Sequence, residues 1–309
     1  MSAPADVGHA DTGATERETW SERRAYLTIA AIAWIARRLP TATGRLVFRW
    51  GGSAAYLVGR RTREVVAANQ AKVLGRAPDD PLVLASTKAA FRGYARYWFD
   101  LFHVAGWLPE RVDRAFTFDG YENLRAALEG GKGAIVALPH MGNWDVAGPA
   151  MAFRGERIVA VAERLRPARL FRLFSRVRAE LAIEVVGLDD AGVGRRLATA
   201  LGEGAVVALI ADRELGSGGI EVEMFGATRR LPAGPAMLHL RTEAPIVPGS
   251  ITQTRDGWRC VLETPLEVTL TGDRRRDATA ITTLLAERFE RAISGAPSDW
   301  FVFQPAWDG

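Results

Sequence analysis

The residues best suited to chemistry lie in one short segment, His-Met-Gly-Asn-Trp-Asp, at 140–145. A carboxylate hydrogen-bonded to one imidazole nitrogen fixes the tautomer, so that the other nitrogen can take a proton from a hydroxyl group. His140 and Asp145 are five positions apart, whereas side chains meet on one helix face at spacings of three or four. They can meet only if the chain turns, and Gly142 permits a turn while Asn143 is a good helix N-cap. The segment predicts a His–Asp pair, either catalytic or purely structural.

A second acidic group is expected near the same histidine. His140 follows the apolar run 134–138, and Asp-Arg-Glu at 212–214 follows the apolar run 205–210. In open α/β sheets, ligands bind outside the carboxyl ends of the strands, and both segments would be delivered there. Glu214 could therefore orient the imidazole in place of Asp145, or it could be a solvated loop charge. We treat His140, Asp145 and Glu214 as one titrating cluster and leave the orienting carboxylate open.

The segment 137–145 also resembles a known motif. It is similar to the H-x4-D motif of glycerolipid acyltransferases. It resembles more closely the H-x-G-N-W-[DE] form of the bacterial branch with the lipid A late acyltransferases and the actinobacterial phosphatidylinositol mannoside acyltransferases. Arg63, Asn69 and the segments 91–100, 211–214 and 244–248 resemble further blocks of that branch, so the likeness covers most of residues 60–265. Asp145, where lipid A enzymes commonly carry Glu, favours the mannoside enzymes, as does the Arg- and Ala-rich composition.

This resemblance implies transfer of a fatty acyl group from a thioester to a hydroxyl, with His140 as general base and without a covalent acyl-enzyme. It also implies that Glu214 orients the imidazole, that Glu163 holds sugar hydroxyls and that Arg178 stabilises the thioester oxyanion or binds phosphate. Solvation on a helix surface is the alternative for Arg178. The expected donor is acyl-CoA, a co-substrate and not a cofactor, and the expected acceptor is a mannose hydroxyl of a glycolipid.

Three other functions remain open from the sequence. The first is acylation of lipid A or a lysophospholipid, with the donor acyl group on CoA or on a carrier protein. The second is non-enzymatic lipid binding, in which His140 and Asp145 are only structural. The third is hydrolysis of acyl-CoA, because a base beside a thioester can also deprotonate water.

Two weaker candidates for substrate binding lie further along the chain. Ile220 ends the stretch Ser-Gly-Gly-Ile at 217–220, which is suited to backbone contact with a pantetheine arm, although such glycines occur in any loop. Glu243 lies between a predicted helix and a predicted strand. The single cysteine, Cys260, excludes an intramolecular disulfide, and no paired His spacing predicts a metal site.

The charge balance indicates anionic partners. The chain has 309 residues with 40 basic and 36 acidic side chains, a formal net charge of +4. Such a balance suits phospholipid head groups or coenzyme phosphates. Nucleic acid is a less fitting partner, because the sequence has no zinc-ligand spacing, no aromatic RNA-binding signature and no clear helix-turn-helix pattern.

The N-terminal region has the pattern of a membrane-surface element. Residues 1–19 are polar and predict a disordered tail. The apolar run 25–36 is bracketed by arginine pairs, and a second basic-edged apolar run covers 45–59. Twelve residues are too short for a span, which needs about 20. We therefore expect residues 20–110 to form helices that pack on the core and associate with an anionic membrane surface, at the cytoplasmic face of the inner membrane. The alternative is an ordinary helix packed on the core.

Strands and helices alternate from residue 111 to residue 309. Continuous apolar runs indicate strands buried on both faces, which predicts a single α/β domain with a central mixed sheet flanked by helices. The predicted strands cover 116–118, 134–138, 157–162, 183–186, 205–210, 246–251, 258–263 and 266–270, with a loop and a short strand in 224–231. The predicted helices cover 63–74, 81–102, 121–130, 167–181, 193–201, 234–241 and 277–293.

Overall fold

The computed structural model describes residues 18–214 and 218–307. The predicted tail therefore lies outside the described residues, except for Glu18 and Thr19. Thr19 caps the first helix: its hydroxyl accepts a hydrogen bond from the backbone N–H of Glu22, and the Glu22 carboxylate accepts one from the backbone N–H of Thr19. This capping box satisfies two N–H groups that the start of a helix leaves unpaired.

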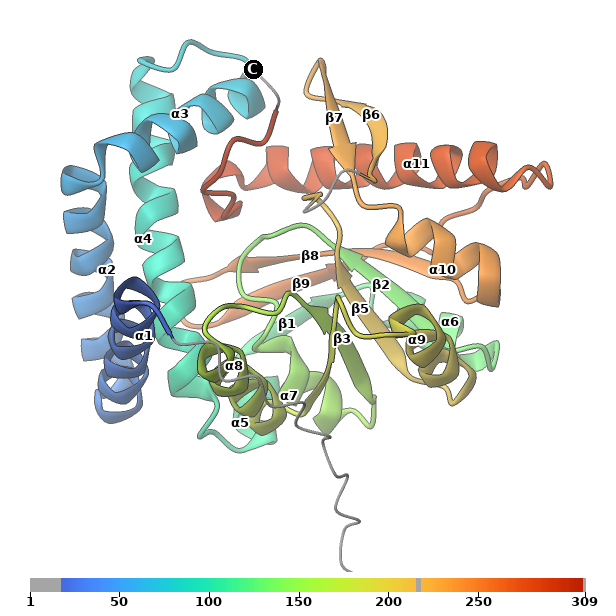
Figure 1. Cartoon of the computed structure of the whole chain (residues 1–309), viewed down its shortest axis with the longest axis horizontal. Coiled ribbons are helices and arrows are strands. Elements are labelled where there is room, and N and C mark those ends of the chain that lie inside the picture. The colour runs from blue at the N-terminus through green and yellow to red at the C-terminus, as the bar shows by residue number, and fades with distance from the viewer. Residues whose placement is uncertain (1–17, 215–217, 308–309) are drawn as a thin grey trace, which may run out of the picture.

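A seven-stranded mixed sheet forms the centre of the molecule (Figure 1). Its strand order is β1-β9-β8-β2-β5-β3-β4, and every neighbouring pair is parallel except β8 and β9. This confirms the predicted single α/β domain. The strands are β1 (Phe116–Asp119), β2 (Ala134–Leu138), β3 (Ile158–Ala162), β4 (Ile183–Gly187), β5 (Val206–Ile210), β8 (Ile246–Gln253) and β9 (Trp258–Leu262).

The central strands are buried on both faces, as their continuous apolar runs predict. In β2, Val136 and Leu138 belong to the core on one face, whereas Ile135 and Ala137 belong to the core on the other. The first core is covered by α6 (Tyr121–Glu129), α7 (Ala147–Phe153) and α8 (Ala168–Glu180), together with the N-terminal helices. The second is covered by α9 (Val193–Gly202), α10 (Gly234–Thr242) and α11 (Arg274–Gly295).

Before the short helix α5 (Pro109–Arg114) and the sheet come four longer helices, namely α1 (Trp20–Arg38), α2 (Thr41–Val58), α3 (Arg60–Leu74) and α4 (Pro81–Val104). The first two pack against α4 at one end of the molecule (Figure 1). Both α1 and α2 also carry exposed apolar side chains, namely Trp20, Leu27, Trp34, Ile35, Leu46, Val47, Trp50, Leu57 and Val58. Among the described residues, no helix combines the length and the apolar character that crossing a bilayer requires.

Some elements differ from the sequence-based expectation. Residues 266–270 form no strand, because only Leu266 donates a ladder-like hydrogen bond, to the carbonyl of Ile246. The predicted loop and short strand are an antiparallel hairpin of β6 (Ile220–Met224) and β7 (Ala227–Leu231), which lies outside the main sheet. One short helix was not predicted, α5 (Pro109–Arg114).

Candidate active site

His140 lies in a loop between the end of β2 and the start of α7. The chain turns there, as predicted, because Gly142 has φ +60. A Cβ atom at this position would lie only 2.2 Å from the carbonyl oxygen of Ile251, so only glycine fits. The loop thus passes directly over β8, which neighbours β2 in the sheet.

Asn143 has a different role from the predicted one. Helix α7 begins at Ala147, with Val146 in the N-cap position. The Asn143 side chain is buried; its amide donates to the carbonyl of Tyr97, and its Oδ1 accepts from the N–H of Val146 at 3.4 Å. The N-cap prediction is therefore wrong, and Asn143 instead ties the turn before the helix to α4.

A C-terminal segment holds the same loop from the other side. Phe301 N–H donates to the carbonyl of His140 at 2.7 Å, and Gly142 N–H donates to the carbonyl of Asp299 at 2.9 Å. Met141 and Trp300 form an isolated antiparallel bridge between these contacts. The backbone of the histidine loop is therefore fixed by a short strand-like pairing with residues 299–301.

The imidazole of His140 is hydrogen-bonded to Asp212. The distance between Nδ1 and Oδ1 is 2.5 Å, and Asp212 is fully buried. Asp212 comes one residue after Ala211, whose N–H extends the pairing of β5 with β2 by donating to Leu138. The second carboxylate oxygen of Asp212 accepts from the indole N–H of Trp300 at 2.7 Å. Two adjacent parallel strands thus deliver the imidazole and its carboxylate to the same edge of the sheet.

Asp212 is ionised in this environment. Burial favours its neutral form, but His140, Arg229 and the indole of Trp300 outweigh burial and lower the pKa of Asp212 to about 2. An ionised carboxylate accepts hydrogen bonds only, so Nδ1 of His140 must donate. The neutral imidazole consequently carries its lone pair on Nε2, which is the arrangement that a general base needs.

Asp145 contacts groups other than His140. Its Oδ1 accepts from Nε of Arg178 at 2.6 Å, and its Oδ2 accepts from the hydroxyl of Tyr97 at 2.7 Å and from Nη2 of Arg178 at 3.3 Å. The group that binds Nδ1 is thus Asp212, where the sequence left a choice between Asp145 and Glu214. Arg178 is not a solvated helix residue either: although burial disfavours its charge, Asp145 holds the Arg178 pKa above the usual range.

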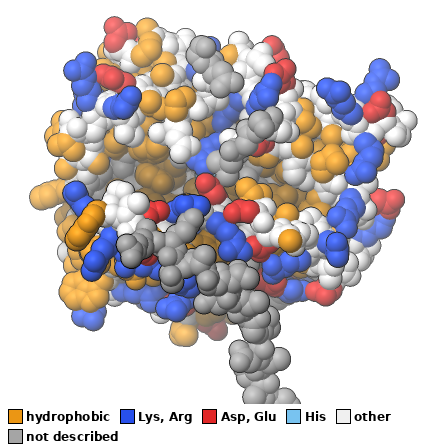
Figure 2. All heavy atoms as spheres, viewed as in Figure 1, with side chains coloured by type: hydrophobic (Ala, Val, Ile, Leu, Met, Phe, Trp, Pro, Cys, Tyr) orange, Lys and Arg blue, Asp and Glu red, His pale blue; other side chains and the backbone are white. Residues whose placement is uncertain are grey.

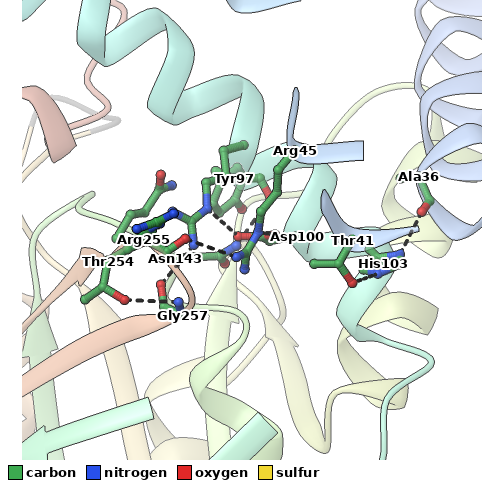
Figure 3. A network of polar contacts seen from close by, with 12 residues as sticks. Ala36, Thr41, Arg45, Tyr97, Asp100, His103, Asn143, Thr254, Arg255 and Gly257 are labelled. Atoms are coloured by element: carbon green, nitrogen blue, oxygen red, sulfur yellow. Dashed lines mark hydrogen bonds and ion pairs between the residues drawn. The ribbon is translucent and has the colours of Figure 1, made fainter. Parts of the chain in front are cut away.

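A network of charged groups surrounds Asp100, which follows Tyr97 on α4 (Figure 3). Asp100 is fully buried between Arg45, at 3.2 Å, and Arg96, at 3.1 Å. Arg96 also donates to the carbonyls of Thr254 and Gly257, in the turn between β8 and β9. Burial raises the pKa of Asp100 although both guanidinium groups oppose this. The network joins α2 and α4 to the turn between β8 and β9.

Two cavities meet beside the ion pair of Asp145 and Arg178. The apolar cavity lies on one face of the sheet and is lined by strand residues such as Ala160 and Ala208. Its empty volume of about 750 Å³ includes space open to solvent. The His140 cavity has about 1820 Å³ of empty volume, part of it open to solvent. The two cavities share five lining residues, Trp144, Val161, Ala162, Arg178 and Ile210.

Two further predicted site residues lie on the wall of the His140 cavity. Glu163 follows β3 and is exposed, with Arg213 at 3.5 Å. Glu214 lies close to Gly219, where an added Cβ atom would be 3.0 Å from its Oε2. One cavity is therefore lined by His140, Glu163, Glu214 and Arg178.

Ile220 and Glu243 do not line the His140 cavity. Ile220 begins β6 and lines a neighbouring cavity with Arg230 and Arg274. Glu243 precedes β8 and forms an ion pair with Lys132, which precedes β2. Because β2 and β8 are parallel, Glu243 lies at the amino edge of the sheet, opposite the edge that carries His140. The structure therefore places Glu243 away from the His140 cavity.

Sequence reasoning missed Asp212, Tyr97 and Trp300. A signal for Asp212 existed, because it follows a buried strand directly and is placed like His140 after β2. Tyr97 lies in the predicted helix 81–102, and nothing local marks its hydroxyl as a partner of Asp145. Trp300 is 88 residues from Asp212, and the sequence carries no signal for their contact.

Comparison with known proteins places the chain among acyltransferases. Residues 14–308 match the family model for the bacterial lipid A biosynthesis acyltransferase. The chain is 36% identical over 284 residues to a phosphatidylinositol mannoside acyltransferase of Mycolicibacterium smegmatis, covering 90% of each chain. It is 37% identical over 290 residues to the protein of that name from Mycobacterium tuberculosis, covering 90% of this chain and 87% of the relative.

Proposed function

The chain belongs to the bacterial lipid A biosynthesis acyltransferase family, and on this premise we propose that it transfers a fatty acyl group from acyl-CoA to a mannose hydroxyl of phosphatidylinositol mannoside. One observation carries the proposal. His140, held by Asp212, lines a partly polar cavity that adjoins an apolar cavity. Acyl transfer to a sugar needs these three parts, namely a base, a place for a polar acceptor and a place for an acyl chain.

The proposed reaction is a direct displacement. The acceptor hydroxyl oxygen attacks the thioester carbonyl carbon while Nε2 of His140 takes its proton. The tetrahedral intermediate then collapses, the C–S bond breaks, and the imidazolium gives the proton to the departing CoA thiolate. The products are an ester of mannose and free CoA. Asp212 stabilises the imidazolium and keeps Nε2 as the reacting nitrogen, so we assign it as a positioning residue.

Arg178 is suited to the charge that develops on the carbonyl oxygen. Its Nε and Nη2 donate to Asp145, and Nη1 is the guanidinium nitrogen that these bonds do not use. It lines both cavities at their junction, where the thioester carbonyl of a chain lying in the apolar cavity would sit. A fixed cation at a developing oxyanion lowers the barrier because it needs no reorganisation during the reaction.

The two glutamates are assigned to the acceptor side. Glu163 and Glu214 line the His140 cavity, and carboxylates accept hydrogen bonds from sugar hydroxyls. Glu214 follows Asp212 by two residues, so it approaches the histidine from the same loop. We assign Glu214 to the acceptor hydroxyl that His140 deprotonates and Glu163 to a neighbouring hydroxyl.

The only cysteine is not suited to a covalent mechanism. Cys260 lines the apolar cavity in the middle of β9, and burial raises the pKa of its thiol to about 12. A neutral thiol is a poor nucleophile. This supports direct attack by the acceptor hydroxyl without an acyl-enzyme.

The N-terminal helices are assigned to the membrane surface. Trp34 and Trp50 are 59% and 69% exposed, and Arg38 lies over the ring of Trp34 at 4.9 Å. Exposed aromatic residues beside arginines fit the interfacial layer of an anionic bilayer, where rings enter the acyl boundary and guanidinium groups meet phosphates. We place the chain peripherally at the cytoplasmic face of the inner membrane, where acyl-CoA is available.

A His140→Ala variant tests the function. Radiolabelled palmitoyl-CoA is incubated with phosphatidylinositol mannoside in vesicles, and labelled glycolipid is counted. We expect wild-type protein to form it and H140A to form none while keeping its circular dichroism spectrum. His239→Gln is the matched control, because His239 contacts the carbonyl of Ala244 away from both cavities, and it should stay active.

Other outcomes would identify other functions. Transfer by H140A at the wild-type rate would refute the mechanism. Release of palmitate to water without an acceptor would indicate a thioesterase. Saturable lipid binding with no transfer by the wild-type protein would indicate a lipid-binding protein.

A further inference from the structure

A third cavity adjoins the His140 cavity and carries a group of arginines. It lies between the β6–β7 hairpin and the start of α11, and its empty volume of about 1330 Å³ includes space open to solvent. Its charged lining consists of Arg230, Arg274, Arg275 and Glu221. We call it the arginine cavity. Three cations against one anion make its wall net positive.

The cationic character of this cavity is largely uncompensated. Arg230 pairs with Glu221 at 2.8 Å, whereas Arg274 and Arg275 form no side-chain ion pair within residues 18–214 and 218–307. The acidic groups at the start of α11 are already engaged. Asp273 accepts from the N–H groups of Arg275 and Arg276, and Asp277 accepts from the N–H of Thr271. Two exposed guanidinium groups therefore face the cavity without a carboxylate partner.

The arginine cavity is continuous with the His140 cavity. Arg274, Ala233 and Met237 line both of them. An elongated ligand can consequently have its reactive end beside His140 and its anionic end among the arginines. Such a ligand must carry several negative charges at one end and a flexible, uncharged arm.

The position of the arginines indicates which of the two substrates, the acyl donor or the lipid acceptor, would bind beside them. The start of α11 lies at the opposite end of the molecule from α1 and α2 (Figure 1). Figure 2 shows Lys and Arg side chains along this edge, over α10 and α11. If α1 and α2 rest on the membrane, the lipid acceptor enters from their end. A water-soluble substrate then enters from the arginine end.

We propose that the arginine cavity binds the phosphate groups at the nucleotide end of CoA, so that the pantetheine arm runs through the shared wall to His140. This assignment rests on the proposed function, since it presupposes a thioester donor. Guanidinium groups suit phosphates because their forked N–H donors match the phosphate oxygens. The diphosphate and the ribose phosphate of CoA supply the several charges that the cavity wall matches.

The test compares R274E/R275E with R276E in the full chain. Arg276 is the matched control, because it is a neighbouring exposed arginine of α11 that does not line the cavity. The KM for palmitoyl-CoA is divided by the KM for palmitoyl-pantetheine, which lacks the nucleotide phosphates. We expect this ratio to rise about tenfold in the double variant, the loss of one or two charge-assisted hydrogen bonds, and to match wild type in the control.

A binding measurement separates this inference from the proposed function. Calorimetric titration with CoA itself should show about tenfold weaker binding to the double variant, and this needs no acyl transfer. Equal CoA affinity of the double variant and wild type would overturn the inference even if transfer proceeds normally. If no donor supports transfer, the proposed function fails while the CoA titration still decides the inference. An effect with palmitoyl-carrier protein but not with palmitoyl-CoA would overturn the assignment to the nucleotide.

Discussion

Asp212 lies 2.5 Å from Nδ1 of His140, and it reaches that position because β5 and β2 are parallel neighbours that end at the same edge of the sheet. The pairing is set by the strand register, which places Ile210 opposite Leu138. Each functional side chain then lies two residues beyond the end of its strand. The most rigid part of the fold therefore fixes the distance between the base and its carboxylate.

Replacing Asp212 with Asn should reverse the tautomer of His140. The Asn oxygen would still accept from the indole of Trp300, so its amide would face Nδ1 as a donor. The imidazole would then carry its proton on Nε2 and could not act as a base. We expect kcat to fall about a thousandfold or more with little change in KM.

The pH profile of residual D212N activity shows whether the defect lies in the base. If D212N keeps the pH profile of the wild type and a kcat within about threefold of it, the positioning role of Asp212 is contradicted. Asp190→Asn is the control, because Asp190 pairs with arginines at the surface.

Replacing Asp145 with Ala should destabilise the fold as well as the site. The change leaves Arg178 and the hydroxyl of Tyr97 without their carboxylate in a mostly buried position. We expect the free energy of unfolding in urea to fall by about 3 to 5 kcal/mol. The control is Asp119→Ala, which breaks an exposed pair with Arg259 and should cost about 1 kcal/mol or less. Equal losses in the two variants would show that the Asp145 pair does not stabilise the fold.

Asp299 should make stability fall as the pH rises from about 4 to about 6. Burial raises its pKa to about 6 in the folded protein, against the backbone N–H of Gln253 and the charge of Arg96, which lower it. An unfolded Asp ionises near pH 3.9, so between these values the folded state binds more protons and is destabilised by raising the pH. The loss is at most ~3 kcal/mol. Urea unfolding of wild type and D299N across this range measures it, and D299N should lack this component of the slope.

Filling the apolar cavity should change the acyl chain that the enzyme accepts. Ala208 lies in the middle of β5 and lines this cavity, so Ala208→Leu reduces the space for the chain. We expect the ratio of kcat/KM for palmitoyl-CoA to that for decanoyl-CoA to fall severalfold. Ala137→Leu is the control, because Ala137 is fully buried on the other face of the sheet. It should cost about 1 to 3 kcal/mol of stability without changing the donor ratio. An unchanged ratio in A208L would argue that the acyl chain lies elsewhere.

Removing the exposed tryptophans of α1 and α2 should weaken membrane binding. Burying a large apolar side chain contributes about 1.5 to 3 kcal/mol, so W34S/W50S should reduce partitioning into anionic vesicles at least tenfold. Vesicle flotation measures the bound fraction. Leu270→Ser is the control, since Leu270 is 49% exposed but lies outside α1 and α2, four residues before the start of α11. Equal loss in both variants would show that binding is not specific to α1 and α2.

The sequence was sufficient for the central strands of the fold. The run 134–138 has the bounds of β2, and the run 205–210 includes β5, because a strand buried on both faces leaves a continuous apolar signature. The segment 266–270 also alternates apolar and polar residues, yet forms no strand. Strand formation depends on a partner with free backbone groups, and pattern alone carries no information about that partner.

The site was predictable in part. The order of apolar runs and polar residues along the sequence predicts the loop with His140, the turn at Gly142 and the acidic segment after β5. That Asp212 holds the imidazole, and not Asp145 or Glu214, does not follow from the sequence, because it depends on where the last ladder hydrogen bond of β5 lies. The position of Glu243 at the opposite edge of the sheet does not follow from the sequence either, since it depends on the direction of β8 relative to β2, which is a long-range property.

The bridge between Met141 and Trp300 makes the histidine loop dependent on residues made late in synthesis. Trp300 binds the carboxylate that holds the imidazole, and its neighbours bind the backbone on both sides of Met141. The backbone of the histidine loop and the carboxylate partner of His140 therefore both depend on residues 299–301, so changes in this segment should disturb the site although it does not line the His140 cavity.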